Sequence, residues 1–198
     1  MIQFNNLSKE MPFLVLREKY DQALRSEQKS IDALNISSYN TETKEVSSRY
    51  VNLKYIINNE FIFFTNYVSP KAISFNLHDQ IAALLYWSNI NLQIRIKAKI
   101  KKTSAEFNQN YFSKRSPEKN ALAISSNQSK PIESYGMVKE NFKKTLENDN
   151  LKKCPSYWGG YSLTPYEIEF WEGDKHRLNK RDLYILDEAT WNHFILQP

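Results

Sequence analysis

The sequence predicts an α+β protein that is mainly β, an antiparallel barrel with helices around its outside. Short extended segments follow one another through tight turns, which is typical of antiparallel sheets and not of βαβ units. Residues 92–102 (LQIRIKAKIKK) alternate strictly between apolar and polar side chains, as does a strand with one buried face. Neither G-x-G-x-x-G nor G-x-x-x-x-G-K-[ST] occurs, which excludes the Rossmann and P-loop classes of nucleotide site.

Composition indicates one folded domain over residues 1–198. Hydrophobic residues make up 41% of the chain and aromatic residues 14%, enough to build a core. Residues 1–11 are expected to be a flexible tail. The start of the chain lacks the features of a signal peptide and no apolar run is long enough to span a membrane, so we expect a cytoplasmic protein. Cys154 is the single cysteine and is expected to be a free thiol.

The charge balance favours an anionic partner. Lysine and arginine number 27 against 22 aspartate and glutamate residues, a formal net charge of +5. Part of this charge lies on the polar face of the 92–102 strand, from Arg95 to Lys101, which leaves nucleic acid as a minor alternative. The three histidines are scattered, with no cysteine beside them, so no metal site is predicted.

The first half of the chain predicts a helix, a β-meander and a second helix. A helix is expected over residues 12–26 because apolar residues recur there at helical spacing, namely Phe13, Leu16, Tyr20 and Leu24. Turn-like segments separate extended stretches at 33–39, 46–57 and 61–66. Ser69 and Pro70 then predict a helix start, since serine is favoured at the N-cap and proline at the first helical position.

The second half predicts further strands and two more helices. Thr103 and Glu106 form a capping-box pattern that opens a helix to about residue 114, and Ser134 caps another. The segment 116–132 between them is expected to be a loop. Strands are expected at 81–87, 92–102, 158–163, 167–173, 181–186 and 191–196.

Two groups of residues in the first half could bind an anion. The helix start at Ser69-Pro70 offers free N–H groups to a phosphate, and Lys71 adds a full charge; the alternative is an ordinary capped helix. Arg49 and Lys54 would face opposite sides of a regular strand. They could share a site only if the strand ends, bends or bulges between them, and otherwise they are solvated charges.

Two further groups lie later in the chain. Tyr111 and Arg115 are spaced i, i+4 and would share one helix face, where they could hold a phosphate or form a plain surface pair. Trp171 closes one expected strand and is followed by Arg177 and Arg181. An indole with two guanidinium groups suits a flat anionic ligand, although the tryptophan could equally be a core residue.

Together these groups resemble one family in order and spacing. The matching stretches are RYVNLK (49–54), FFTN (63–66), the SxK of 69–71, Gln93, NQS (127–129), WGGY (158–161) and IEFWEG…RL…R (168–181). With them the chain, from about residue 12 to Pro198, resembles the pyridoxamine 5′-phosphate oxidases and their FMN-binding split-barrel relatives. The resemblance implies a split β-barrel, an FMN cofactor and a homodimer with FMN at the interface.

The resemblance also implies roles for particular residues. The FMN contacts, some of them from a second subunit, would be Arg49, Tyr50, Val51, Asn52, Leu53, Lys54, Phe64, Thr65, Lys71, Gln93, Gln128, Ser129, Trp171 and Arg181. The substrate contacts would be Lys54, Tyr111, Arg115, Lys119, Arg177 and Asn179, with Arg177 as the catalytic residue that fixes and polarises the substrate. The implied reaction is oxidation of pyridoxamine or pyridoxine 5′-phosphate to pyridoxal 5′-phosphate by O2, with release of H2O2.

Departures from the family pattern keep other functions open. Pro70 replaces an arginine beside the FMN phosphate, Lys119 a serine on the substrate phosphate, Asn179 a histidine, and Ile124 a tryptophan. A first alternative is therefore an FMN-dependent oxidase of another small anion, such as a dihydrophenazine-type carboxylate, since the loop ALAISSNQS and the ending LQP are similar to the phenazine-biosynthesis branch. A second alternative is a non-catalytic flavin-binding protein.

Overall fold

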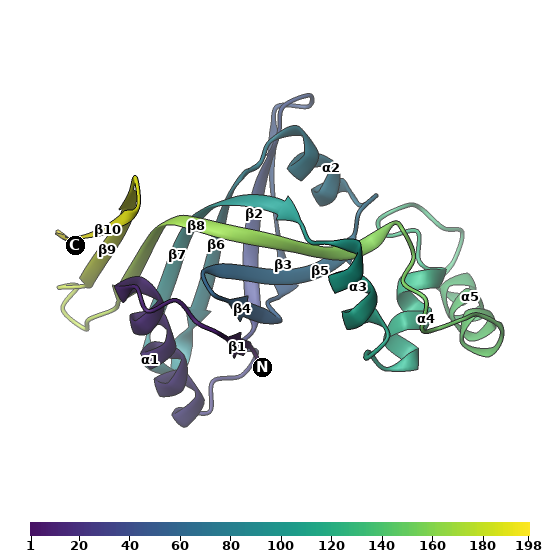
Figure 1. Cartoon of the computed structure of the whole chain (residues 1–198), viewed down its shortest axis with the longest axis horizontal. Helices are drawn as coiled ribbons and strands as arrows, with labels where there is room; N and C mark the ends of the chain where they lie inside the picture. The colour runs from purple at the N-terminus through teal and green to yellow at the C-terminus, as the bar shows by residue number, and fades with distance from the viewer.

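The computed structural model describes all residues, 1–198, and contains one curled sheet of ten strands with five α-helices around it (Figure 1). The strands are β1 (Gln3–Asn5), β2 (Ala33–Asn40), β3 (Glu45–Asn52), β4 (Tyr55–Ile57), β5 (Glu60–Asn66), β6 (Gln80–Trp87), β7 (Leu92–Lys102), β8 (Trp158–Glu172), β9 (Lys180–Asp187) and β10 (Thr190–Leu196). The helices are α1 (Met11–Arg25), α2 (Pro70–Leu77), α3 (Ala105–Phe112), α4 (Pro117–Ser125) and α5 (Tyr135–Asn148). None of the helices is both long and apolar enough to cross a membrane.

The strand order confirms the predicted antiparallel half-barrel. The strands follow one another as β1-β4-β5-β8-β7-β6-β2-β3, with β9 paired to β8 and β10 to β9. All of these pairs are antiparallel except β1 with β4, which is parallel. The helices α3, α4 and α5 gather at one end of the molecule and β9 and β10 at the other (Figure 1).

Alternation along β7 builds one wall of the core. Ile94, Ile96, Ala98 and Ile100 are all buried, as the sequence predicted, while the residues between them point outward. On the other side α1 closes the core with Phe13 and Leu16, both fully buried. Phe13 contacts Phe61 of β5 and Trp191 of β10. The helix therefore holds the middle of the sheet and its last strand together.

The long strand β8 connects the two ends of the molecule. It is 15 residues long and pairs with β7 over most of its length. Its other edge is shared, because β5 pairs with residues 158–163 near its start and β9 with residues 167–172 near its end. The sequence predicted two separate strands here, and Pro165 stands at the point where the β7–β8 register shifts. A proline at a bulge is tolerated in a strand, so β8 continues through it.

Three local expectations were wrong. Residues 3–5 are not a flexible tail, because they form the edge strand β1, which pairs with β4, and Ile2 is buried in the core. The expected loop 116–132 contains α4, which begins with the same Ser-Pro signature as α2, at Ser116 and Pro117. Helix α3 is capped one residue later than expected, by Ser104, whose hydroxyl accepts the N–H of Phe107.

Candidate functional site

Lys71 is a buried cation at the start of α2. Its Nζ donates to Thr65 Oγ1 at 2.9 Å and to Ser69 Oγ at 3.1 Å, and no carboxylate pairs with it. Burial, together with the nearby charge of Arg49, lowers the pKa of Lys71 to about 8. A desolvated ammonium that meets only hydroxyl groups lacks a counter-ion. This environment favours an anion placed against Lys71.

Arg49 supplies the second charge of the same site. From β3 its guanidinium donates to Ser38 Oγ at 2.9 Å, to the Ile36 carbonyl at 3.3 Å and to Ser47 Oγ. Burial lowers the pKa of Arg49, and no carboxylate neutralises it. Two half-buried or buried cations whose neighbours are hydroxyl groups form the donor set of a phosphate site. The donor chemistry therefore fits the phosphate of a cofactor.

Gln128 and Thr65 complete this group, which we call the phosphate cluster (Arg49, Lys71, Thr65 and Gln128). The Thr65 hydroxyl lies 3.4 Å from Gln128 Oε1, so the segment after α4 returns to the end of β5. Ser129 follows in a left-handed conformation, with φ 67°. The structure thus brings together residues from four parts of the chain that the sequence had matched to one ligand.

Lys54 makes its contact outside the phosphate cluster. The strand does end between Arg49 and Lys54, since β3 stops at Asn52 and β4 begins at Tyr55. However, Lys54 Nζ forms an ion pair with Asp32 at 3.1 Å, so its charge is already compensated. Leu53 is fully buried in the core and can offer a ligand only its backbone. Tyr50 is 72% exposed, Asn52 is also exposed and Val51 is half-buried.

Tyr111 and Arg115 lie in an aromatic stack beside β5. The Tyr111 ring is nearly parallel to that of Phe64, with centroids 3.7 Å apart. Arg115 follows α3 instead of lying within it, and its guanidinium carbon lies 4.5 Å from the centroid of the Trp158 ring. Arg115 donates to Asn120 Oδ1 at 3.0 Å and has no carboxylate partner, and burial lowers its pKa. Arg115 is therefore a second site for an anionic group.

A second group of predicted residues lies on a single rung of the sheet, which we call the tryptophan rung (Gln93, Trp171 and Arg181). Gln93 of β7 pairs with Trp171 of β8, and Trp171 pairs with Arg181 of β9. Glu169 holds this group, because its Oε1 accepts from Arg181 Nε at 2.7 Å and from Arg95 Nη1 at 3.3 Å. Sequence reasoning missed Glu169, whose role depends on the cross-strand register.

Arg177 lies in the loop that follows the tryptophan rung. A cavity of about 530 Å³ is lined by Trp171, Arg177 and Asn179, together with the end of the chain. Arg177 is exposed and has a left-handed backbone, with φ 66°. Asn179 Oδ1 accepts the backbone N–H of Asp174 at 3.1 Å, so this amide closes the loop. Lys119, in the first turn of α4, is exposed and lies at the opposite end of the molecule.

The predicted site residues thus fall into two sets at opposite ends of β8. Phe64 pairs with Gly160 and Arg181 pairs with Trp171, which is 11 residues further along the strand. At about 3.3 Å per residue this is roughly 36 Å of strand. A small ligand that contacted both Arg115 and Arg177 would therefore have to take one of them from each of two protomers.

The outward face of β7 is neutralised by ion pairs. Arg95 pairs with Glu169 at 3.3 Å. The three lysines that follow it, Lys97, Lys99 and Lys101, pair with Glu167, Asp79 and Glu60 at 3.0, 2.7 and 2.7 Å. Basic side chains that are already paired with carboxylates neutralise few phosphates of a nucleic acid and therefore release few of its counter-ions. This arrangement argues against the nucleic-acid alternative.

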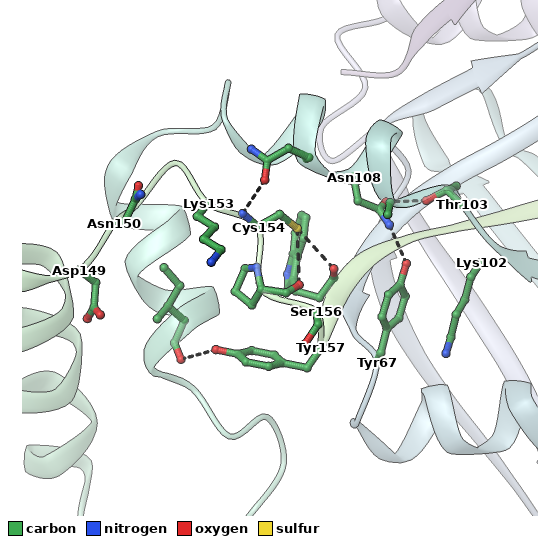
Figure 2. A pocket seen from close by; sticks show the side chains of 15 residues that line it. Tyr67, Lys102, Thr103, Asn108, Asp149, Asn150, Lys153, Cys154, Ser156 and Tyr157 are labelled. Carbon is green, nitrogen blue, oxygen red and sulfur yellow. Dashed lines mark hydrogen bonds between the residues drawn. The ribbon is translucent and has the colours of Figure 1, made fainter.

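A further cavity lies between α3 and residues 149–157, which lead into β8 (Figure 2). Its volume is about 870 Å³, and it is lined by Asn108, Tyr67 and Cys154 among others. Cys154 is a free, half-buried thiol whose pKa is raised by burial. Asn108 was missed from the sequence. The Gly-Gly pair of WGGY is the sequence signal that could have indicated a close contact between Asn108 and β8.

Comparison with known proteins gives a consistent result. Residues 158–198 match the family described as the pyridoxine 5′-phosphate oxidase C-terminal dimerisation region. Pyridoxine/pyridoxamine 5′-phosphate oxidases from Leptospira interrogans and Burkholderia cenocepacia are 30% and 35% identical over 190 and 192 residues. These alignments cover 94% of this chain and 88% and 89% of the two relatives.

Two solved structures share the fold. PhzG from Burkholderia lata 383, in complex with tetrahydrophenazine-1-carboxylic acid, has a TM-score of 0.89 and 25% identity, covering 96% of this chain and 93% of that one. A pyridoxamine 5′-phosphate oxidase-related, FMN binding protein from Nostoc punctiforme has a TM-score of 0.77 and 15% identity, covering 92% and 97%.

Proposed function

Because the chain belongs to the pyridoxine/pyridoxamine 5′-phosphate oxidase family, we propose that it is an FMN-dependent oxidase that converts pyridoxine or pyridoxamine 5′-phosphate to pyridoxal 5′-phosphate. The observation that carries this proposal is the pair of uncompensated cations, Arg49 and Lys71, on residues that match the FMN-phosphate contacts of the family. Their burial without carboxylates is costly unless an anion joins them.

FMN would be held by residues from two protomers. Arg49, Lys71 and Thr65 would bind its phosphate, and Gln128 and Ser129 would contact it from the segment after α4. The tryptophan rung of the partner would complete the site, which accords with the match of residues 158–198 to a dimerisation region. The functional unit is accordingly proposed to be a homodimer with two equivalent sites.

The substrate would be gripped by the aromatic stack. Arg115 is the uncompensated cation nearest to Tyr111, and both are desolvated, which strengthens a charge-assisted hydrogen bond to a phosphate oxygen. Arg177 of the partner would bind and orient the substrate ring. Bound FMN would supply an acceptor for two electrons and two protons of the substrate, which O2 would take up as H2O2; with the amine substrate, water would also be consumed and ammonia released. The protein would contribute position and charge.

An anaerobic reduction experiment tests the cofactor and the substrate together. Purified protein loaded with FMN is mixed with pyridoxine 5′-phosphate without oxygen, and the flavin absorbance near 450 nm is followed. We expect bleaching, recovery of the absorbance when air is admitted, and one H2O2 per aldehyde formed. A flavin that stays oxidised would contradict the proposed substrate, and a protein that does not retain FMN would contradict the oxidase proposal itself.

The role of Arg177 gives the first prediction. Arg177→Ala is expected to lower kcat/KM about 100-fold or more while leaving FMN affinity within about twofold, because this side chain is proposed to orient substrate and not cofactor. FMN affinity is measured by quenching of flavin fluorescence. His176→Ala, on the neighbouring exposed residue, is the matched control. Loss of FMN from Arg177→Ala to the same extent as loss of turnover would contradict the assignment.

Two observations favour a second substrate class. Lys54, matched to the substrate phosphate, is held by Asp32, and Asn179, which replaces the family's histidine, closes its own loop. A reduced tricyclic carboxylate, the ligand class of the PhzG complex, has no phosphate group and would not need Lys54. Its carboxylate could bind Arg115. Oxidation of a dihydrophenazine carboxylate, with no oxidation of pyridoxine 5′-phosphate, would select this alternative.

A further inference from the structure

Helix α3 carries Tyr111 and leads into Arg115, yet its buried face is small. Only Asn108 and Phe112 are buried in this eight-residue helix. An amide in a buried position is unfavourable unless its polar atoms are bonded. The position of Tyr111 and Arg115 therefore depends strongly on what Asn108 binds.

Asn108 forms hydrogen bonds with Gly160 of β8, Thr103 and Tyr67, and Figure 2 shows the bonds to Thr103 and Tyr67. Its Oδ1 accepts from the Gly160 N–H at 2.8 Å and from the Thr103 hydroxyl at 2.5 Å. Its Nδ2 donates to the Tyr67 hydroxyl at 3.0 Å, and Tyr67 in turn donates to the Gly160 carbonyl at 3.0 Å. The amide thus links α3 to the Gly160 backbone directly and again through the Tyr67 hydroxyl.

The glycine pair at 159–160 makes this contact possible. A Cβ at Gly159 would lie 2.4 Å from Asn108 Nδ2 and 2.2 Å from the Tyr67 hydroxyl oxygen, and a Cβ at Gly160 would lie 2.6 Å from Thr103 Oγ1. Real side chains do not approach so closely, so a larger residue at 159 would push α3 away from the sheet, and one at 160 would displace Thr103 just before α3. The sequence WGGY is accordingly explained by the packing of α3.

The same rung of the sheet carries the partner of Tyr111. Gly160 pairs with Phe64 of β5, and the Phe64 ring stacks on Tyr111 at 3.7 Å. Asn108 therefore ties α3 to the rung on which the aromatic stack is built. A shift of this helix would move Tyr111 off Phe64 and Arg115 off Trp158 together.

We infer that Asn108 is a positioning residue that sets the substrate-binding geometry of Tyr111 and Arg115 through its bonds to Gly160, Thr103 and Tyr67. This inference rests on the proposed function, in which Tyr111 and Arg115 hold the anionic group of the substrate. Asn108 does not itself reach the ligand. Its effect would fall on the KM for substrate, with little change in kcat or in FMN affinity.

The test compares Asn108→Ala with Asn110→Ala in the FMN-loaded protein. Asn110 is an exposed asparagine of the same helix whose side chain makes no hydrogen bond, so it is a matched control. With pyridoxine 5′-phosphate as substrate, Asn108→Ala is expected to raise KM about tenfold and change kcat less than about threefold, and Asn110→Ala to change neither. Tyr67→Phe, which removes one partner only, should raise KM about threefold and tests the inference if Asn108→Ala fails to fold.

A double-mutant cycle with Arg115→Ala separates positioning from general loss of stability. If Asn108 acts through Arg115 as well as Tyr111, the Asn108→Ala substitution should raise KM by a smaller factor in the Arg115→Ala background than in the native protein. Additive effects, or an unchanged KM in both Asn108→Ala and Tyr67→Phe, would overturn the inference. An unchanged KM in Arg115→Ala alone would instead contradict the proposed substrate grip.

The single cysteine gives a readout that needs no substrate. Gln109 of α3 accepts the backbone N–H of Cys154 at 2.9 Å, so a displaced α3 should expose this half-buried thiol. Asn108→Ala should react with a thiol reagent about tenfold faster than Asn110→Ala. Equal rates would overturn the inference even if pyridoxine 5′-phosphate were not turned over.

Discussion

Lys71 shows how one buried side chain links the stability of the fold to the binding of an anion. Its pKa of about 8 lies below the 10.5 of an exposed lysine because burial and Arg49 both disfavour its charge. In the cofactor-free protein the folded state therefore gains stability as the pH rises from about 8 to about 10.5, where only the unfolded chain still holds the proton. A bound phosphate would reverse this preference and keep Lys71 charged.

Lys71→Met should separate these two effects. At pH 7 the cofactor-free variant is expected to unfold a few degrees higher than the native protein, since it no longer buries a charge, and to bind FMN about tenfold or more weakly. The FMN affinity of the native protein should fall between pH 7 and pH 9.5, because binding must then supply a proton to Lys71. The affinity of Lys71→Met should not show this fall. Fluorescence titrations at several pH values measure both, and equal pH profiles would contradict the role of Lys71.

Single residues could be predicted from sequence only where the signal is local. Ser69, Pro70 and Lys71 are adjacent, so this helix start with its lysine was visible in the sequence as a candidate anion site. The Ser69 hydroxyl accepts from Lys71 and does not cap the helix N–H groups. The partners of Arg49 were not visible. Ser38 lies on another strand, and its approach to Arg49 follows from the β2–β3 register, which alternation along one strand does not determine.

At the scale of elements, close packing of β8 against Thr103, which precedes α3, and against β5 depends on glycine. Gly160→Ala would place a methyl group 2.6 Å from Thr103 Oγ1 and 3.1 Å from the Phe64 ring. We expect it to lower the free energy of unfolding by about 2 kcal/mol or more, as overpacking does. Gly136→Ala is the matched control, because its Cβ would meet nothing closer than 3.4 Å within α5 and should stabilise by about 0.5–1 kcal/mol. Urea unfolding measures the free energy of unfolding of both variants. Similar decreases in the two variants would contradict the packing argument.

Strands were predicted better than the helical end of the molecule. The alternation in β7 and the turns of the meander placed most strands within a few residues. Helix α4 was missed because its apolar residues do not form a clear helical stripe, even though Ser116 and Pro117 repeat the start signature of α2. The continuity of β8 through Pro165 was missed for a physical reason as well, since a bulge that accommodates proline depends on β7.

At the scale of the whole molecule, the separation of Arg115 from Arg177 predicts complementation between chains. Arg115→Ala and Arg177→Ala homodimers should both be nearly inactive. In a mixed dimer one of the two sites would combine the intact Arg115 of one chain with the intact Arg177 of the other. Random pairing of equal amounts should therefore restore about a quarter of native activity, because half of the dimers are mixed and half of their sites are whole. Activity of a refolded mixture measures this, and no recovery would contradict a site shared between protomers.

The fold class was predictable from sequence, and the resemblance implied that some contacts come from a second subunit, but the sequence did not show which of the proposed residues lie together in one chain. That grouping follows from the length of β8 and from the way β5 and β9 share one of its edges. Residues far apart in sequence can be matched to one ligand by order and spacing alone. Which of them a single chain can bring together is decided by the three-dimensional path of the strand.

The long strand also has a consequence for how the protein would keep its cofactor in a cell. Since β8 holds the phosphate cluster and the tryptophan rung apart, an isolated chain would offer only half of the surroundings of the ligand. The fraction of chains that hold FMN would then depend on the concentration of dimer. Dilution would release the flavin even though no contact residue had been changed. A newly made chain at low abundance would remain colourless until it met a second copy, which makes the supply of active enzyme depend on the square of its expression level.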